Sequence, residues 1–333
     1  MILLLVIAFV VCVIVVGGWH ALIRMPGRSF RGSLPAPDQP IAVLRDELRR
    51  DVEKLAGEIG ERNASRCHEK LIVAADFLES SFTRAGYTVK RQGYEVSDKI
   101  CHNLEAEIRG SKQADEIVVV GGHYDSVYGC PGANDNATGA AAVLALARAF
   151  AGKQTERTLR FVEFVNEEPP YFQTPDMGSV VYAKRCRERK ENIVAMFSLE
   201  TMGYYSDEKN SQTYPPIIKS LYPTTGNFIA FVGNTASKQL VTQVIASFRR
   251  HAKFPSEGIA TWETLPGIGL SDHWSFWKQG YPALMVTDTA FFRYTHYHTI
   301  NDTPDKIDYE RMARVVAGLE KVIAELANPE TKP

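Results

Sequence analysis

Apolar runs typical of strands alternate with helical segments along most of the chain, and this alternation is the feature that most restricts the fold. EIVVVGG at 116–122 is a continuous apolar run, typical of a strand buried on both faces. The Ala- and Leu-rich segment 137–152 that follows has helical character, and the pattern repeats from 158–165 onward. Strands that alternate with helices predict an α/β protein, here a three-layer α/β/α sandwich with a mostly parallel mixed central sheet.

The sequence divides into three parts: an N-terminal segment at 1–24, a linker and a folded domain. Residues 25–40 are rich in Pro, Gly and Ser and are expected to form a linker. Residues 41–328 are expected to form a single domain, which closes with a helix at 309–327. With 45% hydrophobic residues, a domain of this length can bury a full core.

The N-terminal segment 1–24 has no charged side chain before Arg24. About 20 apolar residues suffice to cross a bilayer, so the segment is expected to be a membrane span or a signal peptide. It lacks a basic start and a small-x-small cleavage site, which favours an uncleaved transmembrane helix. Arg24, Arg28 and Arg31 follow the span, and positive charge at this place favours a cytoplasmic domain.

Net charge and cysteine content restrict the possible functions less than the strand and helix pattern restricts the fold. A formal net charge of −1 gives no support to nucleic-acid binding, which needs a basic face. Cys67, Cys101, Cys130 and Cys186 allow three disulfide connectivities or four free thiols, and the sequence does not decide between these alternatives. No feature of the sequence indicates the oligomeric state.

Acids and imidazoles follow the predicted strands at the points where the strands end. They are His123 and Asp125, Glu167 and Glu168, Glu200, and His298 in the loop after the last strand. Each would be unremarkable alone, as a loop histidine or a solvated acid. Because ligands bind beyond the carboxyl ends of strands in such sheets, their joint placement predicts a functional site at one edge.

The stretch GGHYDSVYGCPGANDNATG, residues 121–139, could be a surface turn, a phosphate-binding loop or part of a metal site. It lacks the Lys-Ser/Thr of a Walker loop and matches no G-x-G-x-x-G, while Asp135 would repel phosphate. The chain has no G-x-S-x-G of a serine hydrolase. Clustered carboxylates repel one another unless a cation lies among them, and imidazole and carboxylate ligands suit zinc.

Taken together, H-x-D, N-D-N-A-T-G, N-E-E, an acid after a strand and Y-H-T-x-x-D-T resemble the zinc-dependent aminopeptidase family of clan MH. The family includes compact bacterial aminopeptidases, glutamate carboxypeptidase, the glutaminyl cyclases and the transferrin receptor ectodomain. The resemblance covers about residues 41–326, with the motifs in the family's order. The chain has no room for the extra domains of the larger members, so it is most similar to the compact aminopeptidases.

The resemblance implies two zinc ions, with cobalt or manganese as alternatives. Asp135 would bridge them, His123 and Glu200 would complete one site, and Glu168 and His298 would complete the other. Glu167 would be the general base that takes a proton from the bridging water. Many aminopeptidases of the family have Asp where this chain has Glu200, and the longer side chain changes the reach of that ligand.

Other residues are expected to support this centre. Asp125 follows His123 by two and would orient its imidazole from the same face of the strand. Tyr297 would donate a hydrogen bond to the oxyanion. We expect Asp272 and His273 to be supporting residues and His296 to be a loop histidine, and PPYFQTPDMGS at 169–179 to form part of the pocket wall.

The resemblance favours a co-catalytic exopeptidase that removes N-terminal residues from peptides with a free N-terminus. The alternatives are a single-zinc glutaminyl cyclase and a non-catalytic membrane-anchored ectodomain. Relatives of this type are mostly exported, so we expect a membrane-anchored protein whose catalytic domain is periplasmic or extracellular. Arg24, Arg28 and Arg31 argue for the opposite orientation.

Overall fold

The computed structural model describes Ile7, Phe9, Gly17, Gly18 and residues 24–329 of the 333-residue chain. The predicted transmembrane helix, residues 1–24, therefore falls largely outside the described residues. Within the part of the chain that is described, no helix has both the length and the apolar character that a membrane span needs.

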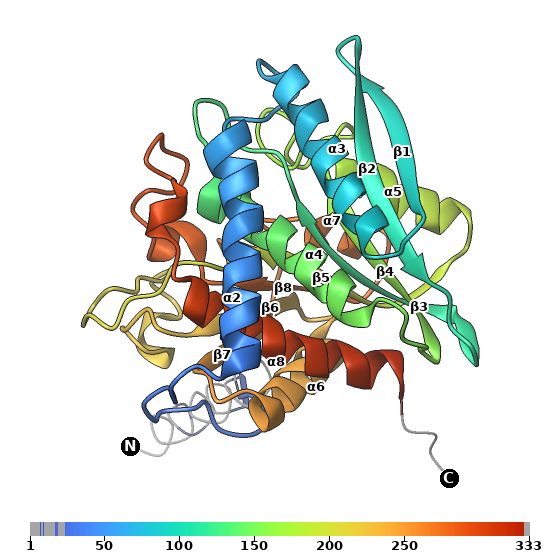
Figure 1. The fold of residues 1–333 in the computed structure, drawn as a ribbon. Coiled ribbons are helices and arrows are strands. Elements are labelled where there is room, and N and C mark those ends of the chain that lie inside the picture. Colours follow the sequence, from blue (N-terminus) through green and yellow to red (C-terminus); the bar gives the residue numbers. More distant parts are fainter. Residues whose placement is uncertain (1–6, 8, 10–16, 19–23, 330–333) are drawn as a thin grey trace.

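An eight-stranded mixed sheet forms the centre of the molecule (Figure 1). Its strands are β1 (Val89–Val96), β2 (Lys99–Ile108), β3 (Gln113–His123), β4 (Arg157–Phe164), β5 (Asn192–Glu200), β6 (Ile229–Asn234), β7 (Ser256–Thr261) and β8 (Ala283–Thr287). They lie in the order β1-β2-β4-β3-β5-β8-β6-β7. The neighbours β4, β3, β5 and β8 are mutually parallel, β6 pairs with β7 in parallel, and the remaining pairs are antiparallel.

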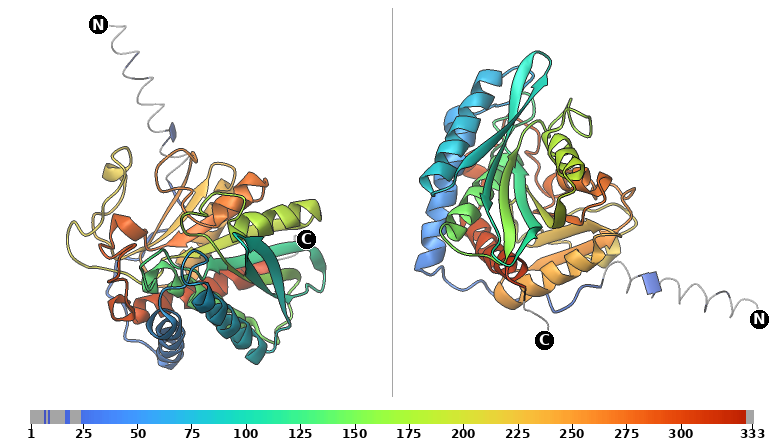
Figure 2. Two further views of the ribbon diagram at one scale, coloured as in Figure 1. Left: turned by 90° about the horizontal axis from the view of Figure 1, so that it is seen from above. Right: turned by 90° about the vertical axis from the view of Figure 1, so that its right-hand side faces the viewer.

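Helices cover both faces of this sheet, as the edge-on view in Figure 2 shows. One face carries α2 (Gln39–Val52), α3 (His68–Arg84), α4 (Thr138–Phe150), α6 (Lys238–His251) and α8 (Tyr309–Ala327). The other carries α5 (Gly178–Glu188) and α7 (His273–Lys278). Short π or 3-10 turns are η1 (Glu53–Ile59), η2 (Ala133–Ala137), η3 (Lys219–Leu221), η4 (Ala290–Phe292) and η5 (Pro304–Lys306). The predicted three-layer α/β/α sandwich is confirmed.

The apolar run of β3 is continuous because the strand is buried on both faces. Val118 and Val120 belong to the core under α4, whereas Ile117 and Val119 belong to the core under α5 and α7. Successive side chains of a strand point to opposite faces, so a central strand must be apolar at every position. The two long helices at the ends of the domain begin at aspartate caps: Asp38 accepts from Ile41 N and Asp308 from Arg311 N, both at 3.0 Å.

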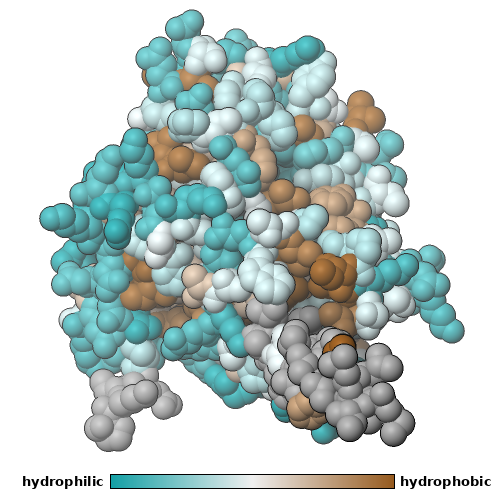
Figure 3. All heavy atoms as spheres, turned by 180° about the vertical axis from the view of Figure 1, so that it is seen from behind, coloured by the Kyte–Doolittle hydropathy of each residue, from teal (hydrophilic) through white to brown (hydrophobic). Residues whose placement is uncertain are grey.

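The segment 25–40, predicted as a linker, runs along the body of the domain. Met25 is buried against Gly258, where an added Cβ would lie 3.0 Å from the Met25 Cγ. Arg249 donates to the carbonyl of Pro26 at 3.0 Å, and the Ser256 amide donates to Ser29 Oγ at 2.9 Å. On the face opposite to that of Figure 1, apolar residues form several separate patches among polar ones (Figure 3).

The described cysteines settle the alternatives left open by the sequence. Cys67, Cys101, Cys130 and Cys186 are all free thiols, and three of them are buried. The fold is therefore held by its apolar cores and hydrogen bonds rather than by crosslinks among these four residues.

Candidate metal centre

Four parallel strands bring the predicted residues to one edge of the sheet. His123 is the last residue of β3 and Glu200 the last of β5, while Glu167 and Glu168 follow β4 after a two-residue turn. His298 lies in the loop after β8. Since β4, β3, β5 and β8 are adjacent and parallel, their carboxyl ends meet, and the predicted edge site is present.

The backbone is left-handed at residues that flank this site. Asn166, Thr201 and His298 have φ of 59°, 45° and 58°, values that residues other than glycine seldom adopt. Such conformations persist where surrounding contacts fix them, and they gather at functional sites. Here they turn the chain sharply after β4 and β5 and aim the side chains across the sheet edge.

Asp135 lies in the loop between β3 and α4, and the carboxylate of Asp302 fixes its backbone. Asp302 Oδ1 accepts from Asn134 N at 2.8 Å, and Oδ2 accepts from Asp135 N at 3.1 Å. Tyr294 donates to Asp302 Oδ1 at 2.8 Å. The sequence reasoning gave Asp302 no role, although it is the aspartate of the Y-H-T-x-x-D-T stretch.

The two oxygens of Asp135 face different imidazoles. Oδ1 lies 3.3 Å from His123 Nε2, and Oδ2 lies 3.0 Å from His298 Nε2. Glu200 Oε2 completes the His123 side at 3.3 Å, and Glu168 Oε2 completes the His298 side at 3.1 Å. We call the whole group the metal-site cluster: His123, Asp135, Glu167, Glu168, Glu200 and His298. Its closest contacts divide it into two halves that share one carboxylate.

Ligand atoms across the cluster are close enough to bind common cations. Those of His123, Glu167 and Glu200 lie within 4.8 Å of one another, and so do those of His123, Asp135 and Glu168. These two groups do not coincide with the two halves of the cluster, because each group contains His123. The shortest contacts are the better guide to pairing, since they show which atoms face each other.

Asp125 lies beneath the cluster and contacts two of its parts. Its Oδ1 lies 3.4 Å from His123 Nδ1, as expected for a carboxylate that orients the imidazole. The same side chain accepts from the amides of Glu167 at 3.1 Å and Glu168 at 3.2 Å. Asp125 therefore holds the turn after β4 as well, a role that the sequence did not reveal.

Glu168 and Glu200 also have contacts that fix their orientation. Glu168 Oε1 accepts from the amide of Val127 at 3.1 Å, which leaves Oε2 to face His298. Ser271 Oγ donates to Glu200 Oε2 at 2.7 Å. Among the side chains of the cluster, His298 is the most open at 31% exposed, so access to the site is from its side.

The electrostatics of the cluster show a shortage of positive charge. Burial, followed by the nearby Asp135, raises the pKa of Glu168 to about 8. Burial raises the pKa of Glu200 and, more strongly, that of Glu167. Burial opposes a charged His298, yet its contacts with Asp135 and Glu168 raise its pKa to about 10. Among the described residues, no Lys or Arg forms an ion pair with these carboxylates.

Two imidazole nitrogens at the centre of the cluster test whether a metal fits. His123 Nε2 and His298 Nε2 are buried without a hydrogen-bond partner among the described residues. Buried polar atoms are seldom left unpaired, and each of these is surrounded by carboxylate oxygens. Nitrogen and oxygen ligands that converge in this way suit zinc. The carboxylate of Asp135, which faces both imidazoles, suits a site for two ions.

The other predicted residues lie around the cluster. The ring of Tyr297 stacks on His298 at a centroid distance of 3.9 Å. Asp272 is fully buried, and His273 Nε2 lies 2.7 Å from the carbonyl oxygen of Ile268. Neither residue belongs to the described groups whose ligand atoms converge. His296 is a loop residue whose ring packs against Tyr294.

Arg62 is a further residue that the sequence reasoning missed. It is fully buried, and its guanidinium donates to carbonyl oxygens of the loop that carries Asp135. The acceptors include Tyr124 at 2.5 Å, Pro131 at 2.5 Å and Gly132 at 2.9 Å. A single charged side chain thereby fixes the loop between β3 and α4. Nothing in the sequence around Arg62 distinguishes it from a surface arginine.

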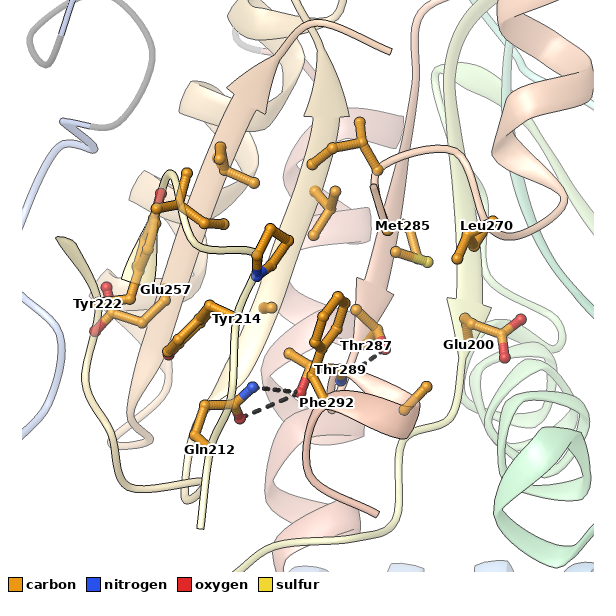
Figure 4. Close-up of a pocket in the computed structure, with 18 of the residues that line it drawn as sticks. Glu200, Gln212, Tyr214, Tyr222, Glu257, Leu270, Met285, Thr287, Thr289 and Phe292 are labelled. Atoms are coloured by element: carbon orange, nitrogen blue, oxygen red, sulfur yellow. Dashed lines mark hydrogen bonds between the residues drawn. The ribbon is translucent and has the colours of Figure 1, made fainter. Parts of the chain in front are cut away.

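A pocket opens beside Glu200 and Tyr297 and extends away from the cluster along β8, β6 and β7 (Figure 4). Its walls come from residues 212–232, 257–270 and 285–297. Residues 169–179, predicted to form a pocket wall, do not line it. That stretch folds back on β4 instead, where the Gly178 amide donates to the carbonyl of Val165 at 2.7 Å.

Comparisons with known proteins agree with this geometry. Residues 103–323 match the model of peptidase family M28, and the chain belongs to this family. The predicted membership of the zinc aminopeptidase clan is therefore confirmed, and so, at the level of the family, is the enzyme class of metallo-aminopeptidase. An uncharacterized Escherichia coli protein, YfbL, is 32% identical over 292 residues, which cover 85% of this chain and 88% of that protein.

Solved structures share the fold at low identity. A zinc aminopeptidase from Bacillus subtilis superposes with a TM-score of 0.69 at 14% identity, covering 86% of this chain and 96% of that one. A glutaminyl cyclase from Fimbriiglobus ruber superposes with a TM-score of 0.63 at 22% identity, covering 90% of this chain and 99% of that one. Since both activities occur on this fold, the fold alone does not choose between them.

Proposed function

We propose that the protein is a co-catalytic di-zinc aminopeptidase that removes N-terminal residues from peptides. The observation that carries this proposal is the position of Asp135, whose two oxygens face His123 and His298 separately. His123 and Glu200 would hold one ion, and Glu168 and His298 the other. Zinc is the expected metal because family relatives are zinc enzymes, and cobalt or manganese could occupy the same ligands.

Zinc held by these residues would lower the pKa of a bound water and polarise the scissile carbonyl. Glu167 is the general base of this proposal. Its Oε2 lies 3.7 Å from His123 Nε2, inside the cluster, and its backbone is held by Asp125. It accepts a proton from the attacking water and can return that proton to the leaving amine.

Tyr297 is the proposed hydrogen-bond donor to the oxyanion. Burial and the neighbouring carboxylates, Asp135 first among them, raise the pKa of its hydroxyl far above the ordinary value. The hydroxyl therefore keeps its proton and can donate it in a hydrogen bond as negative charge develops on the carbonyl oxygen. The stacked ring of Tyr297 on His298 fixes the direction in which the hydroxyl points.

The geometry favours hydrolysis over cyclisation and over a non-catalytic role. A cyclase needs one zinc, whereas this cluster has two halves with an imidazole and a carboxylate each. A non-catalytic ectodomain has no need of a carboxylate such as Glu167, whose pKa burial raises, beside the shared Asp135.

Hydrolysis and cyclisation assays test this proposal. The zinc-loaded chain is expected to cleave aminoacyl anilides, to lose this activity with a chelator and to regain it with zinc. Cyclisation of an N-terminal Gln peptide without anilide hydrolysis would replace the aminopeptidase proposal with the cyclase. Absence of both reactions, with no effect of the Glu167→Gln substitution on any activity in the cell, would support the non-catalytic alternative.

We further propose that residues 1–24 anchor the protein in a membrane and that the catalytic domain lies outside the cytoplasm. The support is the uncharged run before Arg24 and the docking of Met25 and Pro26 on the domain. Protease digestion of spheroplasts, before and after their membrane is permeabilised, tests the orientation. A domain that is digested only after permeabilisation would lie in the cytoplasm, the orientation that Arg24, Arg28 and Arg31 favour.

A further inference from the structure

A cavity of about 640 Å³ lies where the N-terminal segment meets the domain. It is lined by residues of the segment 24–31, by Leu221 and Tyr222 between β5 and β6, by Arg249 of α6 and by Glu257 of β7. Figure 1 shows the N-terminal segment in blue beside α6 and β7. Pockets that hold small ligands measure about 300–1,000 Å³, so the cavity is large enough for one. We call it the N-terminal cavity.

The side chains that line the N-terminal cavity are mostly basic. Among the described lining residues, the charged ones are Arg24, Arg28, Arg31 and Arg249, with Glu257 as the one acid. The whole chain has a formal net charge of −1, so this gathering of arginines is local. A concave surface lined by charges of one sign raises the local concentration of ions of the opposite sign. The cavity therefore favours an anion.

Glu257 has a cation of its own and does not use up the other arginines. The buried side chain of Arg249 lies 3.8 Å from Glu257, measured from Nη2 to Oε2. Arg249 also donates to the carbonyl oxygens of Pro26 at 3.0 Å and Ser256 at 2.6 Å, so it is fixed at the base of the cavity. Arg31 favours the charged form of Glu257 as well, but it forms no ion pair with it among the described contacts.

Arg28 and Arg31 are exposed on a backbone that the domain holds in place. Within the described part of the chain, neither side chain has a hydrogen-bond or ion-pair partner. Beside them, Ser29 Oγ accepts from the amide of Ser256 at 2.9 Å, and Met25 is buried. A ligand that binds here pays little for ordering the backbone. Guanidinium groups suit phosphate in particular, because each can donate two parallel hydrogen bonds to its oxygens.

The cavity also lies beside the segment proposed to enter a membrane. Residues 1–23 contain no charged side chain, and Arg24, the next residue, lines the cavity. Arginines that flank a span lie at the level of the lipid headgroups. Leu221 at the edge of the cavity is 40% exposed, and Ile217 of the same loop is 72% exposed. Exposed apolar side chains next to basic ones are typical of a surface that contacts a membrane.

We propose that the N-terminal cavity binds the phosphate of an anionic lipid headgroup through Arg28 and Arg31, with Leu221 against the apolar part of the lipid. This inference rests on the proposed membrane anchor. A headgroup such as that of phosphatidylglycerol carries a net negative charge, which the arginines attract. Phosphatidylcholine has the same phosphate together with a quaternary ammonium group, which the arginines repel, so the cavity discriminates between the two headgroups.

A binding measurement with short-chain lipids tests the proposal. The full chain is titrated in detergent with dihexanoyl phosphatidylglycerol or dihexanoyl phosphatidylcholine, and its thermal unfolding temperature is followed. Each arginine at an anionic lipid surface strengthens binding about fivefold, so phosphatidylglycerol should act at about 10- to 30-fold lower concentration. Arg28→Gln/Arg31→Gln should remove this preference without changing the unfolding temperature in detergent alone. Equal action of the two lipids on the wild type would overturn the proposal.

A matched double variant controls for the loss of two positive charges. Arg187→Gln/Arg189→Gln changes two arginines at the end of α5, which do not line the N-terminal cavity. This variant should keep the full preference for phosphatidylglycerol. Loss of the preference to the same extent in both double variants would show that only the overall charge of the chain matters, and it would contradict a site at Arg28 and Arg31.

Two soluble anions separate a lipid from a free phosphate. Inorganic phosphate and glycerol phosphate should raise the unfolding temperature only at concentrations at least about tenfold above that of dihexanoyl phosphatidylglycerol, because they lack the apolar part that Leu221 contacts. Leu221→Gln should weaken the action of phosphatidylglycerol and leave that of glycerol phosphate unchanged. If glycerol phosphate acts as strongly as the lipid on the wild type, the cavity is a site for a free phosphate and the lipid assignment fails.

Extraction of membranes at alkaline pH separates the failure of this inference from the failure of the proposed anchor. An anchored chain stays with the membrane fraction after extraction. If the chain is released but the preference for phosphatidylglycerol depends on Arg28 and Arg31, the anchor proposal fails and the lipid site stands. If the chain stays in the membrane and shows no preference between the two lipids, the lipid site fails alone.

Discussion

Two buried clusters of charged residues shift the pKa of a glutamate in opposite directions. Glu105 on β2 accepts from Tyr182 at 2.8 Å, Arg185 at 2.6 Å and Lys90 at 3.1 Å. We call these four residues with Arg160 the Glu105 cluster. Burial alone would raise the pKa of Glu105, but Arg160 and Arg185 outweigh it and lower the pKa to about 2. Glu168, equally buried in the metal-site cluster, has its pKa raised to about 8.

The two clusters differ in the source of the positive charge that neutralises their carboxylates. In the Glu105 cluster, arginine and lysine side chains of the chain itself supply it, so this cluster has a structural role. The metal-site cluster gathers carboxylates without any Lys or Arg among its described ion pairs, and its imidazole nitrogens lack hydrogen bonds. Carboxylates whose pKa values are raised by burial and by neighbouring carboxylates, beside imidazole nitrogens that lack hydrogen bonds, are typical of a site for an external cation.

The largest expected effect separates the two clusters by activity. Glu167→Gln should lower kcat about 10²- to 10⁴-fold, since the side chain can no longer accept a proton, while the zinc content stays the same. Glu105→Gln should leave kcat of the folded, zinc-loaded chain unchanged. Steady-state kinetics with metal analysis of the same samples checks both. Equal activity of the wild type and Glu167→Gln would remove Glu167 from the mechanism.

Zinc removal should destabilise the protein through the metal-site cluster alone. Each zinc ion at 1,000 times its dissociation constant should add about 4 kcal/mol to the free energy of unfolding, so two ions should add about 8 kcal/mol. Urea unfolding with and without a chelator measures this difference. The same difference is expected in Glu105→Gln, because that cluster does not contact the metal. A zinc effect that disappears in Glu105→Gln would show that the two clusters are coupled.

A matched pair of substitutions sharpens the comparison in the metal-free chain. Glu105→Gln should lower the free energy of unfolding by about 3 kcal/mol, since it leaves buried arginines short of their counter-charge. Glu168→Gln should leave the metal-free chain no less stable than the wild type, because it removes a carboxylate that repels Asp135. Equilibrium unfolding in a chelator tests both. A large loss in Glu168→Gln would mean that the site is a structural ion-pair network.

The smallest expected effect is a pH dependence that belongs to the Glu105 cluster. The folded pKa of Glu105, about 2, lies below its ordinary value of 4.5. Its stabilisation is therefore fully present above pH 4.5 and is lost as the pH falls from 4.5 towards 2. The stability difference between the wild type and Glu105→Gln should narrow over this range. A difference that is constant between pH 5 and pH 3 would contradict the lowered pKa.

The sequence predicted the metal-site cluster because its residues follow strands whose apolar pattern is strong. His123, Glu167 and Glu200 end or follow continuous runs, and parallel strands leave them only one edge to share. The alternation of strands and helices likewise predicted the three layers. Both inferences depend on local patterns that adjacent residues carry.

Contacts between distant segments were beyond such reasoning. Asp302 fixes the backbone of Asp135 across 167 positions, and Arg62 binds carbonyl oxygens about 70 positions away. The stretch 169–179, predicted to form a pocket wall, does not line the pocket beside Glu200, because nearness to Glu168 in the chain does not decide which cavity a segment faces.

The most direct test of the account is the zinc content of the purified full chain, measured beside the Asp135→Asn variant. The account predicts two zinc ions per wild-type chain and a loss of bound zinc in the variant, because both halves of the metal-site cluster share that carboxylate. A single zinc ion per wild-type chain, or an unchanged content in Asp135→Asn, would contradict it.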